Sequence, residues 1–97
     1  LLLTPTASVP AFPISQRPSL IDGKPVNKIW GAFLLTPLAN LTGLPAASVP
    51  CGFSSERLPI GLQIIGRAGE ESTVLRASAA FEAAQPWADE TPPDFSA

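Results

Sequence analysis

The sequence contains no histidine, no methionine and no tyrosine, and its one cysteine is Cys51. Without histidine, a Cys/His zinc site, a Ser-His-Asp triad and a Cys-His pair cannot form within the chain. A lone cysteine also excludes an internal disulfide framework. We therefore expect neither a metal nor a cofactor.

Charge is scarce as well. Charged residues make up 14% of the 97 residues, against about 25% in a typical soluble domain, and the net charge is −2. These charged residues are too few to cover the surface of an isolated small domain. We therefore expect part of the surface to lie against another body of protein. The chain also lacks a basic stripe for a phosphate backbone, which argues against nucleic acid as a partner.

Long apolar runs are missing too. The longest, residues 1–3 and 31–35, fall far short of the ~20 residues that cross a bilayer. No basic segment precedes an apolar signal-like segment, so neither a membrane nor secretion is expected, and the cytoplasm is the default location. Because the chain opens inside the apolar run 1–3, we expect it to be a segment of a longer polypeptide.

The first half of the sequence predicts few regular elements. Residues 1–6 form an apolar strand without alternation, expected to be covered on both faces and to stop at Pro5. The prolines between residues 6 and 28 predict a long irregular loop. Residues 29–38 predict a short helix that Pro37 bends, and Gly43 and Pro45 end this region. The positions expected to share one face of that helix are 30, 33, 34 and 37.

The second half predicts a β-hairpin followed by a helix. Residues 46–49 form a strand that ends at Pro50, residues 51–57 connect, and residues 58–65 form the second strand. The helix runs from about residue 71 to residue 84 because Pro86 forbids its continuation. Its apolar face consists of Val74, Ala77, Ser78, Phe81 and Ala84, and we expect Val74 and Phe81 to pack on the hairpin.

The tail over residues 87–97 is polar and proline-rich, and we expect it to fray unless Trp87 packs against the body of the chain.

Two groups of residues suggest chemistry. Ser54 and Ser55, with Lys24 or Lys28 as base, invite a Ser-Lys nucleophile, but the serines lie in a predicted turn and the lysines in a solvated loop. A polar turn is therefore the favoured interpretation. Cys51, at a strand end, is interpreted as a small buried side chain rather than a reactive thiol.

Two further interpretations stay open. Asn40 is either a local backbone cap or a functional residue, with the cap favoured. Trp30 and Phe33 are either core residues or one wall of an apolar pocket, and composition alone favours the core.

Four stretches together resemble the C-terminal segment of the amidase signature family, in the order that the family has them. They read LTPT (3–6), NLTGLPAASVPCGF (40–53), LPIGLQIIGR (58–67) and ESTVLR (71–76). The resemblance implies an α/β fold, here a fragment of an α/β/α sandwich with a mixed β-sheet that includes the C-terminal β-hairpin and amphipathic helix. Residues 1–97 are then the C-terminal part of a single amidase signature domain, with the irregular loop at 6–28 and the polar tail at 87–97.

The resemblance also implies a function. Members of the family hydrolyse carboxamides or, in amidotransferase complexes, release ammonia from glutamine, using a lysine and two serines. That triad lies upstream of this segment, so no residue of the chain is expected to be catalytic, Ser54 and Ser55 included. The expected partners are a small-molecule amide and the upstream part of the same polypeptide, with a homodimer left open.

Within this family the chain is expected to supply a pocket wall. Glutamine-handling members carry an acidic residue at the place that matches Phe33, where an aromatic ring cannot pair with an ammonium group. An apolar or aromatic amide is therefore expected as substrate, with Trp30, Phe33 and Thr36 as substrate-binding residues. The alternatives are a subunit segment of a glutamine amidotransferase and a truncated, non-catalytic module.

Overall fold

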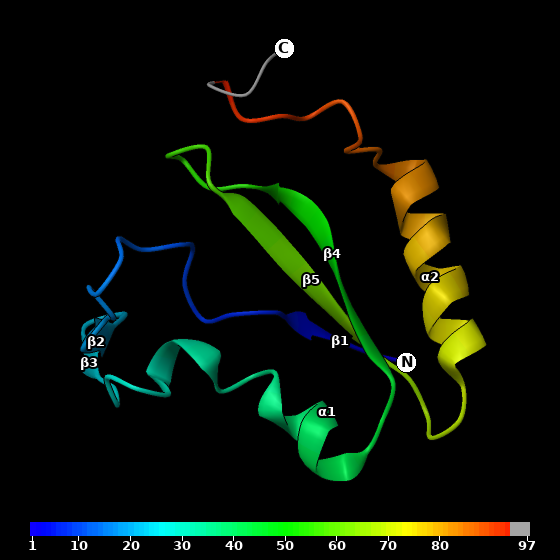
Figure 1. The fold of residues 1–97 in the computed structure, drawn as a ribbon, viewed down its shortest axis with the longest axis horizontal. Helices are drawn as coiled ribbons and strands as arrows, with labels where there is room; N and C mark the ends of the chain where they lie inside the picture. The colour runs from blue at the N-terminus through cyan, green and yellow to red at the C-terminus, as the bar shows by residue number, and fades with distance from the viewer. Residues whose placement is uncertain (94–97) are drawn as a thin grey trace.

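The computed structural model describes residues 1–93. Its centre is a sheet of three strands in the order β1-β5-β4, with β1 at Leu2–Pro5, β4 at Ala46–Phe53 and β5 at Pro59–Ile65. Both pairings in this sheet are antiparallel. Helix α2 (Glu71–Ala84) packs on one face, and residues 31–35 lie on the other (Figure 1). The predicted α/β fold, with its C-terminal hairpin and helix, is confirmed.

The hairpin of β4 and β5 forms as predicted, but β4 does not end at Pro50. It continues to Phe53, and the register shifts between Pro50, which faces Gly61, and Gly52, which faces Ile60. Cys51 is the extra residue of this bulge. Proline is tolerated here because β4 lies at an edge of the sheet, where bulges and missing ladder donors are common.

Strand β1 forms where it was predicted, but it is not covered on both faces. Leu2 lies opposite Ile65 in the ladder with β5, and Pro5 lies opposite Leu62. The side chains of Leu2 and Leu3 remain 51% and 58% exposed. These leucines stay exposed because β1 is an edge strand and α2 packs chiefly on β4 and β5.

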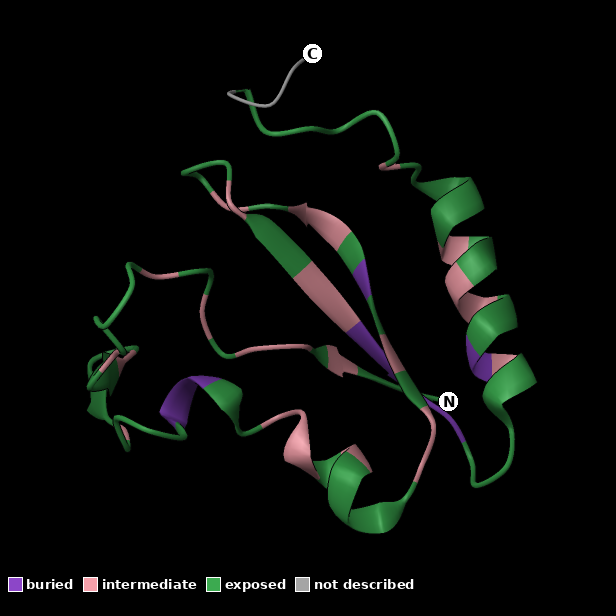
Figure 2. Cartoon of the chain, viewed as in Figure 1, coloured by how far each residue is buried: buried purple, intermediate pink, exposed green. Residues whose placement is uncertain are grey.

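The apolar core lies between α2 and the hairpin. Val49, Ile64 and Val74 are its buried members, with 7%, 2% and 4% of their surface exposed. Figure 2 shows the buried residues of the sheet and the first turns of α2 facing one another. The half-buried residues packed around them are Ala47, Leu62, Ala77, Phe81 and Trp87. The prediction that Val74 and Phe81 pack on the hairpin is therefore confirmed, and each buried side chain contributes roughly 1.5 to 3 kcal/mol.

The single helix predicted over residues 29–38 is wrong. The chain forms a 3-10 turn at Gly31–Phe33 and then a separate helix α1 at Pro37–Thr42. Pro37 occupies the first turn of α1, where its fixed φ suits a helix start and its missing N–H costs nothing. Gly43 caps the C-terminus in the left-handed conformation, as predicted, and its N–H donates to the Ala39 carbonyl.

The cap at Gly43 provides a first test of the fold. Gly43 has a φ of 70°, and a Cβ at this position would meet no atom within 4 Å. We expect Gly43→Ala to lower the free energy of unfolding by about 1 kcal/mol, because only the strained backbone opposes alanine there. Urea unfolding measures the loss. Gly61→Ala serves as a contrast, since its Cβ would instead collide with side chains, and a Gly43→Ala variant as stable as the parent would contradict this account of the cap.

Short elements interrupt the segment expected to be irregular. Strands β2 (Leu20–Ile21) and β3 (Lys24–Pro25) pair antiparallel around Asp22 and Gly23, whose φ angles are 51° and 71°. Two successive positive φ angles are typical of a tight hairpin turn. In the predicted tail, Trp87 packs on the core, and residues 94–97 lie outside the described part.

The chain exposes more surface than a compact protein of its mass. Its accessible surface is 7236 Å², whereas a folded monomer of this mass exposes roughly 5,300 Å². Large apolar side chains contribute to this surface, among them the exposed residues Leu1, Leu2, Leu3, Trp30, Leu34, Leu38 and Leu41. The excess supports the expectation that part of this surface lies against another body of protein. Within residues 1–93, no helix is both long and apolar enough to cross a membrane.

Candidate functional site

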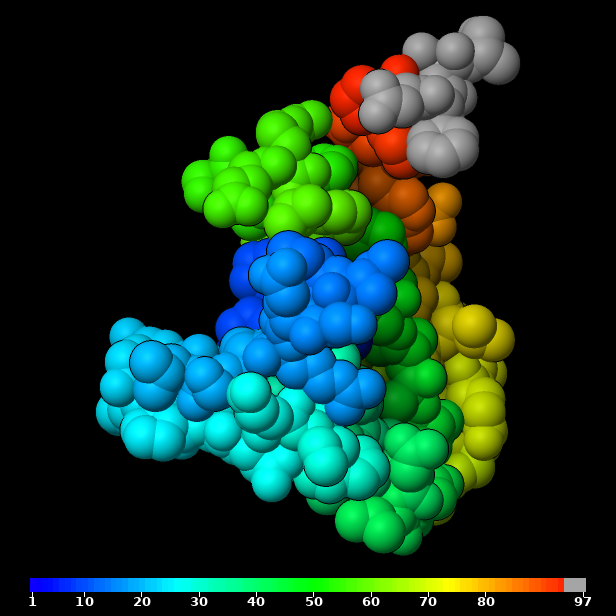
Figure 3. All heavy atoms as spheres, turned by 60° about the vertical axis from the view of Figure 1, so that its left-hand side comes forward, coloured from blue at the N-terminus to red at the C-terminus, as the bar shows by residue number. Residues whose placement is uncertain are grey.

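A pocket of about 400 Å³ opens beside the sheet, where the N-terminal segment passes strand β5 and the 3-10 turn. Its walls come from residues 6–12, from Ala32 and Phe33, from Ser48 of β4, and from Pro59, Ile60 and Gly61 of β5. In the space-filling view the blue N-terminal segment lies across the green strands (Figure 3). The lining is mainly apolar, with hydroxyl groups at Thr6, Ser8 and Ser48.

Two backbone hydrogen bonds fix the N-terminal wall. The Thr6 N–H donates to the Gly61 carbonyl at 3.1 Å, and the Ser8 N–H donates to the Ala32 carbonyl at 3.2 Å. The segment thus extends the line of β1 beyond Pro5 and links β5 to the 3-10 turn. Residues 6–12 have little secondary structure of their own, so these contacts determine where the wall lies.

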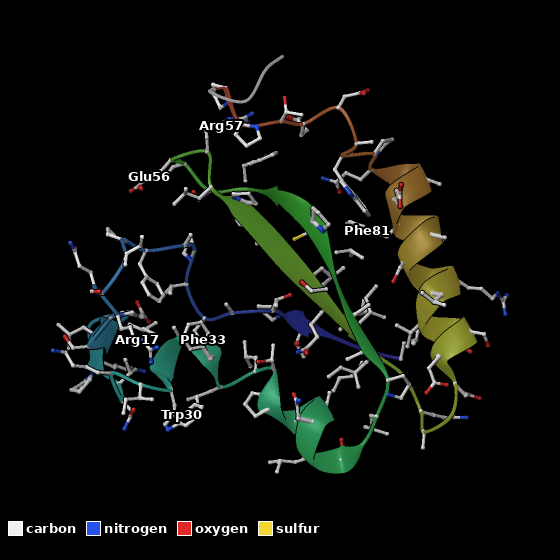
Figure 4. The ribbon with its side chains drawn as sticks, viewed as in Figure 1. Arg17, Trp30, Phe33, Glu56, Arg57 and Phe81 are labelled. Carbon is white, nitrogen blue, oxygen red and sulfur yellow. The ribbon has the colours of Figure 1, made fainter. Side chains whose placement is uncertain are left out.

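The far wall of the pocket is aromatic. The rings of Phe12 and Phe33 lie with centroids 6.1 Å apart and planes inclined at 50°, within the range of favourable aromatic pairs. The guanidinium carbon of Arg17 lies 6.0 Å from the Phe33 centroid, and its Nη1 donates to the Ile29 carbonyl at 3.2 Å. Figure 4 shows Arg17 and Phe33 approaching one another from neighbouring segments. Phe33 is thus held by contacts from two sides.

The buried polar residue Gln63, in β5, holds the segment before α1 against the sheet through hydrogen bonds. It is 4% exposed, and its Nε2 donates both to Thr4 Oγ1 at 2.8 Å and to the Leu35 carbonyl at 2.9 Å. Both amide hydrogens of one side chain therefore join β1, β5 and the segment before α1. Because Leu35 follows Phe33 by two residues, Gln63 also limits how far the aromatic wall can move.

Of the three residues predicted to bind substrate, one lines the pocket and two do not. Phe33 lines the pocket. Trp30 does not; it is 58% exposed and points to the opposite side of the 3-10 turn (Figure 4). Thr36 lies at the N-cap of α1, outside the pocket lining. In this chain both rings are exposed, on apolar surface that is expected to lie against another body of protein, so the core interpretation stays a prediction.

The serine and cysteine candidates have structural roles. Ser54 Oγ accepts hydrogen bonds from the N–H groups of Glu56 and Leu58, so the serine holds the β4–β5 turn together, as the polar-turn interpretation predicted. Cys51 is half-buried in the bulge, and its carbonyl accepts a hydrogen bond from Gln85 Nε2 at 3.3 Å. For Asn40, exposed in α1, the structure gives no side-chain hydrogen bond within residues 1–93, whereas Thr42 Oγ1 caps the Leu38 carbonyl.

Several pocket residues were missed by sequence reasoning. Phe12 and Thr6 lie in the predicted loop, and Ser48 lies in a strand that carries no chemical motif. Gly61 gave the one usable indication, because an isolated glycine in a strand often marks a close approach of other groups. The contacts that build this pocket span tens of residues, and local patterns do not encode them.

Comparison with known proteins agrees with the architecture. The sequence model of the Amidase family matches residues 1–75. An acylamidase from Rhodococcus erythropolis is 39% identical over 94 residues, which are 96% of this chain and 20% of that protein. A glutamyl-tRNA(Gln) amidotransferase subunit from Brevibacillus brevis is 51% identical over 81 residues, which are 84% of this chain and 16% of that protein.

A solved structure is similar as well. The crystal structure of a bacterial aryl acylamidase of the amidase signature family superposes with a TM-score of 0.76 at 38% identity, covering 88% of this chain and 18% of that one. The chain thus spans at most about a fifth of the length of these relatives. Because the family match extends over residues 1–75 and the fold superposes on such a structure, the chain belongs to the amidase signature family.

Proposed function

We propose that this chain is the C-terminal part of an amide hydrolase that converts a carboxamide to a carboxylic acid and ammonia or an amine. The observation that carries the proposal is the mainly apolar pocket beside β5, in a chain of the amidase signature family. In this enzyme the chain supplies the sheet scaffold and one wall of the substrate pocket. Its own residues bind and orient the apolar group of the amide and exclude water from that group.

The catalytic groups lie elsewhere in the proposed enzyme. A serine nucleophile needs an adjacent base, and amide hydrolysis needs donors for the developing oxyanion. Among the described residues no side chain bonds to the Ser54 hydroxyl, whose oxygen accepts two backbone hydrogen bonds within a turn, so Ser54 has no adjacent base. The lysine and two serines that the family resemblance implies therefore belong to the protein upstream of this chain, and residues 1–93 contribute binding.

The preferred substrate has an apolar or aromatic group. Phe12, Phe33, Val9 and Ile60 line the pocket, and no acidic residue does so in the described part of the chain. A free amino acid such as glutamine carries an ammonium group, and burying that group without a carboxylate partner is costly. Among the relatives are both acylamidases and glutamyl-tRNA(Gln) amidotransferase subunits. The lining favours the first, and the amidotransferase subunit is the second candidate. Trp30 and Thr36 as substrate contacts, a homodimer and a cytoplasmic location all stay predictions.

Two assays separate the candidates. The longer protein that contains this chain is expected to hydrolyse aromatic amides with a higher kcat/KM than glutamine, whereas residues 1–97 alone are expected to show no turnover. Both proteins are incubated with 3-phenylpropanamide and with glutamine, and released ammonia is measured. A Ser54→Ala variant of each serves as control and should change neither result.

Preference for glutamine in the longer protein would favour the amidotransferase subunit. Turnover by residues 1–97 that disappears in Ser54→Ala would contradict the assignment of catalysis to the upstream part. An inactive longer protein would favour the non-catalytic module.

A further inference from the structure

Two hydroxyl groups meet at the sheet side of the pocket. Thr6 Oγ1 and Ser48 Oγ lie 2.7 Å apart and share a hydrogen bond, although the residues are 42 positions apart in the sequence. Both residues line the pocket. Thr6 reaches this place because its N–H is bound to Gly61, and Ser48 reaches it from β4 on the other side of β5. The pair therefore joins β4 to the residue that follows β1, across β5.

Gly61 is the reason that the two hydroxyls can meet. A Cβ at position 61 would lie 2.7 Å from Ser48 Oγ and 2.7 Å from Thr6 Oγ1, closer than real Cβ contacts allow. Any larger residue would push the pair apart. The glycine thus leaves a gap in β5 that the two hydroxyls occupy, and Gly61 itself lines the pocket beside them.

The Thr6 and Ser48 hydroxyls keep one hydrogen-bond donor that their mutual bond does not use. Two hydroxyls carry two hydrogens and several lone pairs, and their mutual bond uses one hydrogen whichever oxygen donates. Within residues 1–93, neither Oγ atom has a further hydrogen-bond partner. One O–H hydrogen is therefore available to an acceptor in the pocket. No basic side chain of the described residues bonds to either oxygen, so the pair has no base to make it a nucleophile.

We propose that Thr6 and Ser48 form a hydrogen-bonding subsite that selects amides whose apolar group carries an oxygen acceptor, such as an aryl ether or a phenol. The inference rests on the proposed function, because it refines the substrate class of the same pocket. The Ser8 hydroxyl is the other polar side chain of the lining, and the remaining side chains are apolar. A substrate oxygen placed elsewhere in the pocket gives up its hydrogen bonds to water and gains none in return. An oxygen beside Thr6 and Ser48 instead replaces a hydrogen bond to water by one from an O–H donor.

The test compares amides that differ by one atom. The ring of 3-phenylpropanamide carries a methoxy group or an isosteric ethyl group at its 2-, 3- or 4-position, and kcat/KM is measured with the longer protein. We expect a methoxy preference of about 3- to 10-fold for at least one position, the size of one neutral hydrogen bond. In the Thr6→Val/Ser48→Ala double variant this ratio should fall to about 1. Dissociation constants for the same amides give the ratio independently of turnover.

Two further variants serve as controls for the methoxy/ethyl comparison. Ser78→Ala removes a hydroxyl that bonds the Val74 carbonyl in α2 and should leave the methoxy/ethyl ratio unchanged. If the double variant does not fold, Ser48→Ala alone, at an exposed position of an edge strand, should lower the ratio at least about twofold.

Two results would overturn the inference while leaving the proposed function intact: a wild-type ratio near 1 at all three ring positions, or an unchanged ratio in a folded double variant. Failure of the wild type to hydrolyse or bind any of these amides would instead overturn the proposed function, and this inference with it.

Discussion

Replacing Phe33 by aspartate is expected to reduce kcat/KM for 3-phenylpropanamide by roughly 100-fold in the longer protein. The substitution removes a ring that packs on Phe12 and places a carboxylate in a mainly apolar pocket. Lost apolar contact and a charge that Arg17, 6.0 Å from the Phe33 centroid, offsets only in part each cost on the order of 1 to 3 kcal/mol, discounted here because Phe33 is 40% exposed. Hydrolysis of an amide that bears a cationic group should decline much less.

The matched control for this prediction is Ile14→Asp. It introduces the same charge at an apolar position that is 95% exposed and lies outside the pocket lining. We expect that variant to retain wild-type kcat/KM within about twofold, as is usual for surface substitutions. Equal losses in both variants, or no change in either, would mean that Phe33 does not contact the substrate.

Ile64→Ala is expected to lower the free energy of unfolding by about 3 kcal/mol, within the 2 to 5 kcal/mol usual for buried Ile to Ala changes. Ile64 has the largest fully buried side chain among the described residues, and it belongs to one core cluster with Val49 and Val74. Truncation leaves a cavity that strands β1 and β4 cannot close, because their ladders with β5 hold them apart. Equilibrium urea unfolding, with the m-value compared to the parent, measures the loss.

Leu75→Ala is the control for Ile64→Ala. Leu75 follows Val74 in α2, but its side chain is 66% exposed on the outer side of the helix. A change within about 0.5 kcal/mol is expected there. If both variants lost equal stability, the core would not lie between α2 and the hairpin.

The elements that sequence reasoning predicted correctly are those in which the local pattern and the packing agree. The strand predicted over residues 58–65 and the helical spacing of Val74 and Phe81 each supply an apolar face, and the two faces meet in the core. The error at Pro50 arose because the rule against proline in strands applies to central strands, and β4 is an edge strand. The error over residues 29–38 arose because periodicity does not distinguish a proline that bends a helix from one that begins it.

The candidate site was less predictable than the fold. Phe33 was found through the family resemblance and does line the pocket, but its partners Phe12 and Thr6 come from a loop with no periodicity. Those residues reach the pocket through the hydrogen bonds to Gly61 and Ala32, which are tertiary contacts. A loop of this kind has no local preference strong enough to fix its course, so its position follows from the surfaces that it meets.

The bulge at Cys51 makes the two edges of the sheet unequal. Proline and an extra residue in β4 disturb the regular spacing of donors and acceptors that an incoming strand needs, a device that protects edge strands from aggregation. Strand β1 has no bulge, and its leucines are exposed. A further strand would therefore add to this sheet beside β1 rather than beside β4.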